Sequence, residues 1–220
     1  MNKIRSNIDA IKESINSHVK LIAVTKTRSV EEINTAIEYG IEDIGENKVQ
    51  EILEKYDSVL PVRWHMIGHL QTNKVKSIID KVYLIHSVDS LKIAKEIDKR
   101  ASEKNVVVKV LLQVNIAEED SKYGILVQDF EKCLLDISKY CKNVEIKGIM
   151  CIAPLSDDKE EIDRVFRQAK ELYDKYSQLE LDNVNFEYLS MGMSSDYEIA
   201  IKNGANIIRV GSNIFGKRVY

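Results

Sequence analysis

The sequence has 220 residues, of which 32 are lysine or arginine and 35 are aspartate or glutamate, so its formal net charge is −3. Because these charges nearly balance, the composition argues against a nucleic acid as a partner. No run approaches the roughly 20 consecutive apolar residues that a membrane span needs, so we expect no membrane association and a cytoplasmic protein.

The chain begins with a segment that predicts a helix and continues with alternating strands and helices. Residues 1–20 have the amphipathic spacing of a helix rather than the apolar block of a signal peptide. Eight short runs with strand character follow, separated by longer segments of helical periodicity. These runs are KLIAVTK (20–26), DIGEN (43–47), RWHMIGHL (63–70), VYLIHSVD (82–89), VVVKVLLQVNI (106–116), EIKGIMCIA (145–153), NFEYLSMGM (185–193) and NIIRVGS (206–212).

Three of the intervening helices have recognisable start signals. Each opens with Ser or Asp followed three residues later by Glu, which is the pattern of a capping box. The pairs are Ser29 with Glu32, Asp157 with Glu160, and Ser195 with Glu198. Gly40 and Gly204 stand where the first and the third of these helices should end.

The order of strands and helices predicts the fold class. Several strands are continuous apolar runs, as is typical of parallel strands buried on both faces. Eight strand–helix units favour an α/β fold, a single-domain (β/α)8 TIM-type barrel over residues 1–220 that begins with the N-terminal helix. A doubly wound open sheet is the alternative. No linker or change of composition marks a second domain.

Lys26 ends the first predicted strand directly after an apolar run, which is an unusual place for an ammonium group. Active sites of TIM barrels lie at the C-terminal ends of the strands, so Lys26 would lie at the barrel mouth. Partial burial there would disfavour the charged form and expose a nucleophilic amine, which condenses with aldehydes. The alternative is a surface lysine that simply begins a loop.

The last two predicted strands end in segments suited to a phosphate group. SMGMSSD (190–196) joins a strand to a helix through small and hydroxyl residues, so free backbone N–H groups should gather there. RVGS (209–212) follows on the next strand, and phosphate sites recur after strands 7 and 8 of these barrels. The alternatives are ordinary N-capping in the first segment and a salt bridge of Arg209 in the second.

Three other patterns resemble known sites without meeting their requirements. Residues 211–218 match most of the P-loop pattern, but Arg218 replaces the hydroxyl residue that would hold magnesium. His65 and His69 have the spacing of a metal pair, yet their segment is typical of a strand that runs into a loop. We expect His65 and His86 to be core histidines and no metal to bind. The three cysteines form no C-x-x-C pair, so they predict small buried residues rather than a disulfide or a zinc site.

Seven segments carry a family resemblance that covers nearly the whole chain. They are AVTKTRS (23–29), GEN (45–47), WHMIGHLQTNK (64–74), NIAEEDSKYGI (115–125), GIMCIAP (148–154), SMGMSSD (190–196) and RVGSNIFGKR (209–218). In this order they resemble the pyridoxal 5′-phosphate (PLP) homeostasis proteins, the YggS or PROSC family of barrels related to the N-terminal domain of alanine racemase. Ser212 stands where many members carry threonine, and this difference preserves a hydroxyl group.

The resemblance implies a barrel that holds PLP as a Schiff base on Lys26. Asn47 would lie beside the ring, and the phosphate would be bound through the loops after the last two strands. The cofactor-binding residues implied in this way are Lys26, Asn47, Met193, Ser194, Ser195, Arg209, Gly211 and Ser212. Arg209 would face either the pyridine nitrogen or the phosphate. At the nitrogen, its permanent charge would keep the ring unprotonated and make it a weaker electron sink.

The resemblance further implies a role in intracellular PLP homeostasis and in amino-acid and keto-acid balance, without established catalysis. A PLP racemase needs acid and base groups on both faces of the substrate carbanion, and in related racemases an added β domain supplies the second group across a dimer interface. We expect no such domain after Tyr220. PLP and PLP-dependent apoenzymes would be the partners, and the chain a monomer. Lys122 is either a second docking point for PLP or a solvated charge.

Two other functions stay open. A PLP-dependent racemase or lyase acting on a small amino acid would use a barrel tyrosine or His65 as its base, and sustained loss of α-deuterium from amino acids would favour it. A cofactor-free aldolase-type barrel would instead use Lys26 to form a Schiff base with the carbonyl group of a phosphorylated substrate. Protein that is colourless and takes up no PLP would favour this third function.

Overall fold

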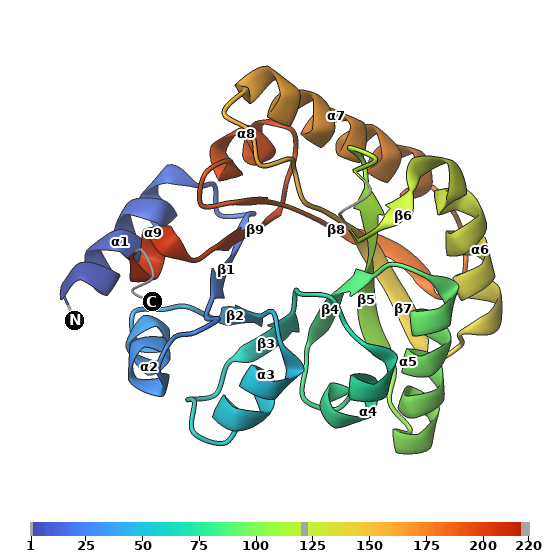
Figure 1. Ribbon diagram of the computed structural model, residues 1–220, viewed down its shortest axis with the longest axis horizontal. Coiled ribbons are helices and arrows are strands. Elements are labelled where there is room, and N and C mark those ends of the chain that lie inside the picture. The colour runs from blue at the N-terminus through green and yellow to red at the C-terminus, as the bar shows by residue number, and fades with distance from the viewer. Residues whose placement is uncertain (1, 120–122, 217–220) are drawn as a thin grey trace.

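The computed structural model describes residues 2–119 and 123–216, and its central feature is a closed barrel of parallel strands (Figure 1). The barrel strands are β1 (Lys20–Val24), β2 (Asp43–Glu46), β3 (Arg63–Met66), β4 (Leu84–Val88), β5 (Val108–Asn115), β7 (Val144–Cys151), β8 (Val184–Met193) and β9 (Ile207–Val210). Each pairs in parallel with the next, and β9 pairs with β1. The predicted TIM-type barrel is therefore confirmed, and the open-sheet alternative is excluded.

All eight predicted strands are present, and one short strand was not predicted. The additional strand, β6 (Ile125–Leu126), pairs with β5 outside the barrel circuit. The first strand is shorter than predicted, because β1 ends at Val24 and not at Lys26.

Helices surround the barrel (Figure 1). They are α1 (Asn2–Ser14), α2 (Val30–Glu38), α3 (Val49–Lys55), α4 (Val75–Ile78), α5 (Leu91–Lys104), α6 (Phe130–Tyr140), α7 (Lys159–Tyr176), α8 (Tyr197–Lys202) and α9 (Ser212–Phe215), with single 3-10 turns η1 (Thr72–Lys74) and η2 (Val127–Asp129). The predicted N-terminal helix is α1, and it packs against α2 and α9. Within the described ranges, no helix combines the length and the apolar character needed to cross a membrane.

The capping residues of α2 are those that the sequence predicts. The backbone N–H of Glu32 donates to the Ser29 hydroxyl at 3.2 Å, and the N–H of Ser29 donates to the Glu32 carboxylate at 3.0 Å. Gly40 follows the helix with a φ of 81°, a conformation that glycine adopts without strain. The box and the terminating glycine are both confirmed.

The other two helix starts differ from the predictions. At α7 the cap is Asp158 rather than Asp157, because the Asp158 carboxylate accepts the N–H groups of the two glutamates at positions 160 and 161. The predicted capping box of Ser195 with Glu198 is wrong. Helix α8 begins at Tyr197, and the Asp196 carboxylate accepts the N–H of Met193, so the acidic residue shapes the turn that leads into the helix.

The core has two layers, one between the strands and the helices and one inside the barrel. Leu21 and Ala23 belong to the outer layer, and Ile22 belongs to the inner one, as the alternation of side chains along a strand requires. The apolar part of the inner layer consists of Ile22, Leu84, Leu111, Met150 and Ile207. His65 and His86 are buried, which confirms them as core histidines.

The cysteines and the remaining sequence patterns also have a structural outcome. None of the three cysteines forms a disulfide within the described residues; Cys141 and Cys151 are buried as predicted, and Cys133 is partly buried. Among the described residues, no group of three or more His, Cys, Asp or Glu side chains is arranged to hold a metal ion. Lys122, and Arg218 of the P-loop-like segment, lie outside the described residues.

Candidate functional site

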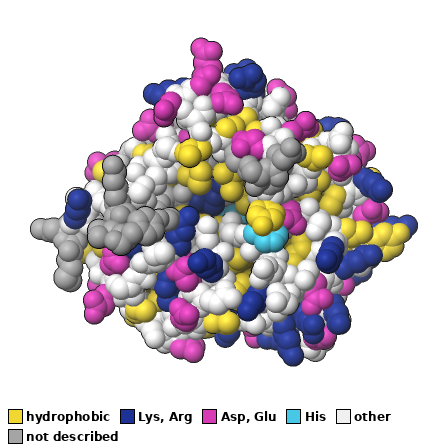
Figure 2. All heavy atoms as spheres, viewed as in Figure 1, with side chains coloured by type: hydrophobic (Ala, Val, Ile, Leu, Met, Phe, Trp, Pro, Cys, Tyr) yellow, Lys and Arg dark blue, Asp and Glu magenta, His cyan; other side chains and the backbone are white. Residues whose placement is uncertain are grey.

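A hollow of about 430 Å³ lies at the carboxyl ends of the barrel strands. Figure 2 looks onto this face and shows a depression near its centre with basic side chains inside it. The hollow gathers seven of the eight predicted cofactor-binding residues, namely Lys26, Met193, Ser194, Ser195, Arg209, Gly211 and Ser212. They come from the loops and strand ends of β1, β8 and β9, which are neighbours in the barrel. Closure of the barrel therefore brings the predicted amine and the predicted phosphate loops together.

Lys26 stays at the barrel rim although β1 ends two residues before it. The backbone N–H of Thr25 donates to the Gly45 carbonyl at 3.0 Å, so the chain remains tied to β2 for one residue beyond the strand. Thr27 then has a φ of 64°, which turns the chain sharply. Lys26 is half-buried between these two residues and lines the hollow, as the sequence predicts for a lysine at the barrel mouth.

A buried ion cluster lies behind the turn that carries this lysine. The Lys55 ammonium donates to the Glu46 and Glu51 carboxylates at 2.8 Å each, and to the Thr25 carbonyl at 3.1 Å. The Thr25 hydroxyl also donates to Glu46 at 2.7 Å. These bonds fix the residue that precedes Lys26.

The same cluster fixes the residue that follows Lys26. Glu51 accepts the backbone N–H of Thr27 at 2.7 Å. Burial raises the pKa of Glu46 even though Lys55 stabilises its charged form. Burial alone would lower the pKa of Lys55, but its bonds to the two carboxylates outweigh burial and raise it. Lys55 is therefore an ammonium ion, and it holds both sides of the Lys26 turn.

The loops after β8 and β9 are joined to each other and present backbone N–H groups. The N–H of Gly211 donates to the Ser194 hydroxyl at 3.2 Å, and the Asn213 side-chain amide donates to the Ser194 carbonyl at 2.9 Å. Within residues 2–119 and 123–216, the structure records no acceptor for the backbone N–H groups of Ser195 and Ser212. Such clustered N–H groups form a cradle for an anion.

The cradle lies close to the first strand because position 211 is glycine. A Cβ atom at Gly211 would lie 3.3 Å from the Cβ of Val24 and 3.4 Å from its carbonyl oxygen. The first distance is tighter than most contacts of a Cβ atom, so Val24 would have to shift by a few tenths of an ångström to admit a larger residue. The glycine lets the cradle and the Lys26 amine share one hollow.

Arg209 lines the bottom of the hollow and is buried, with 4% of its surface exposed. Its guanidinium donates to the Ser190 hydroxyl at 2.6 Å and to the Cys151 carbonyl at 2.9 Å. Among the described residues no carboxylate forms an ion pair with it, so the salt bridge considered as an alternative is not found there. Burial lowers the pKa of Arg209 from an ordinary value so high that the group stays charged at neutral pH.

Comparison with known proteins identifies the family of this chain. The family model of the alanine racemase N-terminal domain matches residues 1–219. The chain belongs to this family. Among its relatives, the pyridoxal phosphate homeostasis protein of Aquifex aeolicus (strain VF5) is 42% identical over 203 residues, which cover 91% of this chain and 88% of that protein. The homeostasis protein of Helicobacter pylori (strain 26695) is 42% identical over 200 residues, covering 90% and 87%. The resemblance predicted from the sequence is confirmed.

Solved structures of the family extend the comparison to the fold. PipY of Synechococcus elongatus PCC7942, solved with PLP bound, has a TM-score of 0.88 and 33% identity, over 97% of this chain and all of that one. An alanine racemase of Clostridium difficile 630 has a TM-score of 0.79 at 13% identity, with 100% of this chain and 58% of the racemase chain covered. The second likeness concerns the fold alone.

Asn47, the eighth predicted cofactor-binding residue, is not among the residues that line this hollow. Asn47 follows β2 and lines a neighbouring hollow of about 590 Å³, whose other residues include Lys48, His69 and Gln71. Asn47 therefore lines a different hollow from Lys26, although it follows β2, whose Gly45 lies beside Val24 of β1 in the sheet.

Four residues of the hollow were not predicted from the sequence. They are Val24, Arg28, Asn213 and Gly216. The Arg28 guanidinium donates to the Gly216 carbonyl at 2.6 Å and lies 5.5 Å from the centre of the Phe215 ring, so it joins the β1 loop to the end of α9. All four lie in the segments AVTKTRS and RVGSNIFGKR, which carry the family resemblance, so the segments contained a usable signal.

Proposed function

We propose that this chain binds PLP in the hollow between β1, β8 and β9 and acts in PLP homeostasis. The observation that carries the proposal is that an amine, an anion cradle and a buried guanidinium line one hollow of about 430 Å³. Relatives that are 42% identical are named pyridoxal phosphate homeostasis proteins, and PipY was solved with PLP bound. These comparisons support the proposal independently of the geometry of the hollow.

The residues present fit the two reactive ends of PLP. The Lys26 amine would add to the aldehyde carbon, and water would leave as the Schiff base forms. The N–H groups of the cradle, with the hydroxyl groups of Ser194 and Ser212, would bind the phosphate. Met193 and Ser195 would complete the wall of the hollow, and Asn47 remains a predicted contact from the side of β2.

We further propose that Arg209 faces the ring nitrogen rather than the phosphate. Arg209 precedes the cradle residues on β9 and is more deeply buried than Gly211 or Ser212, which supports a position toward the ring. A guanidinium donates hydrogen bonds and has no proton acceptor, so the ring nitrogen beside it would stay unprotonated. A ring in this state withdraws electrons weakly, which favours holding PLP over catalysing with it.

The proposal extends to the partners and setting expected from the sequence. The chain would act as a monomer in the cytoplasm and pass PLP to PLP-dependent apoenzymes. Its effect on amino-acid and keto-acid balance would follow from this exchange, without turnover of an amino acid by the chain itself. The names of the relatives support such a role.

An absorption titration tests the proposal. Purified protein should take up PLP in a one-to-one ratio and develop the yellow absorbance of an imine. Lys26→Ala should develop no imine band, while Lys76→Ala, which changes an exposed lysine on α4, should behave as the parent does. Protein that takes up no PLP would overturn the proposal and favour the aldolase-type alternative.

A further inference from the structure

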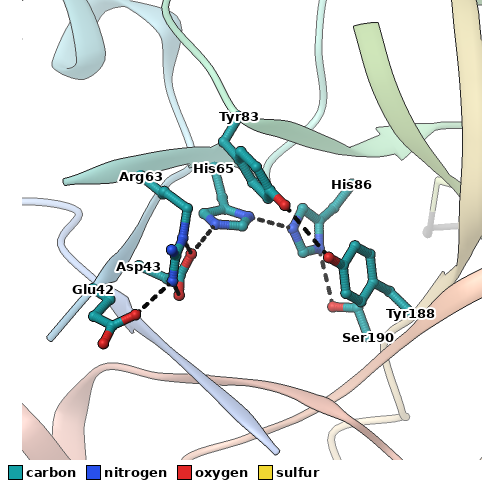
Figure 3. Close-up of polar contacts among 8 residues, drawn as sticks. All are labelled: Glu42, Asp43, Arg63, His65, Tyr83, His86, Tyr188 and Ser190. Atoms are coloured by element: carbon teal, nitrogen blue, oxygen red, sulfur yellow. Dashed lines mark hydrogen bonds and ion pairs between the residues drawn. The ribbon is translucent and has the colours of Figure 1, made fainter.

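A continuous chain of hydrogen bonds crosses the inside of the barrel and ends on Arg209. His65 Nε2 lies 2.8 Å from Asp43 Oδ1, and His65 Nδ1 lies 3.0 Å from His86 Nε2. His86 Nδ1 lies 3.0 Å from Ser190 Oγ, which accepts from Arg209 at 2.6 Å. Figure 3 shows the side chains from Asp43 to Ser190 lying end to end. We call these five residues the barrel relay.

One end of the barrel relay is a fixed hydrogen-bond acceptor. Asp43 receives two bonds from Arg63, from Nε and from Nη2 at 2.7 Å each, and it is buried. Burial alone would raise the pKa of Asp43, but the bonds from Arg63 and His65 outweigh burial and hold it well below its ordinary value. Asp43 is thus an ionised carboxylate that can only accept, and His65 must carry its proton on Nε2.

The positions of the remaining protons follow from the hydrogen-bonding roles of Asp43 and Arg209. Arg209 can only donate, so the Ser190 oxygen accepts from it. With neutral imidazoles, His65 Nδ1 must accept from His86 Nε2–H, and His86 Nδ1 must accept from the Ser190 hydroxyl. Every donor then points the same way, from the guanidinium toward the carboxylate. Burial lowers the pKa of both histidines, which agrees with neutral rings.

This direction explains how a buried guanidinium that pairs with no carboxylate of the described residues is held. His86 draws the Ser190 hydroxyl proton to its own side, which leaves the lone pairs of the oxygen for Arg209. If His86 did not accept that proton, the hydroxyl could rotate and place its hydrogen toward the guanidinium. Aligned donors in a chain also strengthen one another, so the Asp43 carboxylate supports Arg209 through the relay.

The barrel interior does not need polar residues in order to be filled. Apolar side chains fill neighbouring positions of the inner layer, as Ile22, Leu111 and Met150 show. Burying polar side chains costs more free energy than burying apolar ones unless every polar group is hydrogen-bonded. All four links of the barrel relay are made, and the chain terminates on a residue of the hollow.

We propose that His65 and His86 are positioning residues of the PLP site, which act through Ser190 to orient the Arg209 guanidinium at the bottom of the hollow. The inference rests on the proposed function for its ligand, but the relay itself is a property of the cofactor-free protein. Neither histidine touches the hollow. They would therefore affect PLP binding through the Ser190 hydroxyl group.

The direction of the relay is tested without PLP. Long-range 15N–1H spectra of histidine-labelled, cofactor-free protein should show His65 and His86 both protonated on Nε2 at neutral pH, with the His86→Asn and His65→Asn variants assigning the signals. A His86 ring protonated on Nδ1 would mean that the chain runs the other way, and it would overturn the inference whether or not PLP binds.

The effect on PLP is tested by a double-variant cycle. His86→Leu and Ser190→Ala should each weaken PLP binding about tenfold or more, the loss expected for a hydrogen bond to a charged group. The double variant should be no weaker than either single one, because both act through the same contact. His86→Asn, which keeps an acceptor near Ser190, should recover part of the affinity.

Controls separate failure of the relay from failure of the proposed function. His18→Leu changes an exposed histidine outside the relay and should bind PLP as the parent does. If the parent takes up PLP and the single variants bind it equally well, or if their losses add in the double variant, the relay inference is wrong while the proposed function stands. If the parent takes up none, the titration has already overturned the proposed function, and the tautomer spectra still decide the relay.

Discussion

Removal of the Lys55 ammonium should loosen the turn that carries Lys26. In Lys55→Met the Glu46 and Glu51 carboxylates lose their shared cation, and the Thr25 carbonyl loses a donor. The Glu46 side chain is fully buried and that of Lys55 is 11% exposed, so water cannot replace the lost partner. Leaving a buried charge without its partner costs about 3–5 kcal/mol. We expect the lower figure, because Glu51 is partly exposed.

The loss of stability in Lys55→Met and its dependence on pH can be measured in cofactor-free protein. A loss of about 3 kcal/mol corresponds to a fall in Tm of about 6–12 °C for a domain of this size. The pKa of Glu46 is raised above its ordinary value of 4.5 in the folded protein, so its ionised form destabilises the fold as the pH rises from 4.5 through the folded value. Without Lys55 that pKa rises further. The loss should therefore be largest near neutral pH and shrink as the pH falls toward 4.5.

Urea unfolding followed by circular dichroism is the assay, with Lys132→Met as the control. Lys132 is exposed on α6 and forms no ion pair with a described residue, so its change should leave the free energy of unfolding within about 0.5 kcal/mol of the parent. Equal stability of Lys55→Met and Lys132→Met at pH 7 would refute the reasoning. A loss that does not depend on pH would show that packing, and not the Glu46 charge, is its cause.

Three further predictions concern the hollow, the barrel interior and turnover. Gly211→Ala should weaken PLP binding in a fluorescence titration, because the added Cβ would lie 3.3 Å from the Cβ of Val24 and force the cradle away from β1; unchanged affinity would show that the cradle tolerates this shift. Asp43→Asn should lower the free energy of unfolding at pH 7, and the loss should shrink as the pH falls below 3.8, because a carboxyl with a lowered pKa stabilises the fold only where it is ionised; a loss of equal size at both pH values would contradict the ionised assignment. Purified protein loaded with PLP should show no sustained loss of α-deuterium from alanine by mass spectrometry, and a steady loss would favour the racemase or lyase alternative.

Much of the fold follows from local patterns in the sequence. Apolar runs such as KLIAV and the Ser29–Glu32 box act over a few residues, so they identify strands and helix starts without knowledge of the rest of the chain. The two residues of β6 give too short a run to be recognised. The end of β1 was placed two residues too late, because the apolar run does not show where pairing with the neighbouring strands stops.

The candidate site likewise has parts that were predicted from the sequence and parts that were not. Lys26 and the loops after β8 and β9 were predicted because TIM barrels place such segments at one end. The barrel relay was not predicted, since its members come from five different strands and meet through the closure of the barrel. The ion cluster around Lys55 was also not predicted, although Glu46 and Glu51 lie within nine residues of Lys55. His65 and His86 were each expected in the core, but no local pattern indicates that the two rings touch. Asn47 was carried over from the resemblance, and it lines the hollow beside Lys48, His69 and Gln71.

Borohydride reduction of the PLP-loaded protein, followed by peptide mapping, tests the central claim most directly. Reduction makes the link between PLP and its lysine permanent, so the modified peptide identifies the amine that lines the hollow with the anion cradle. We expect a pyridoxyl group on the peptide that contains Lys26. An adduct found on Lys74 or Lys122 and not on Lys26 would contradict it.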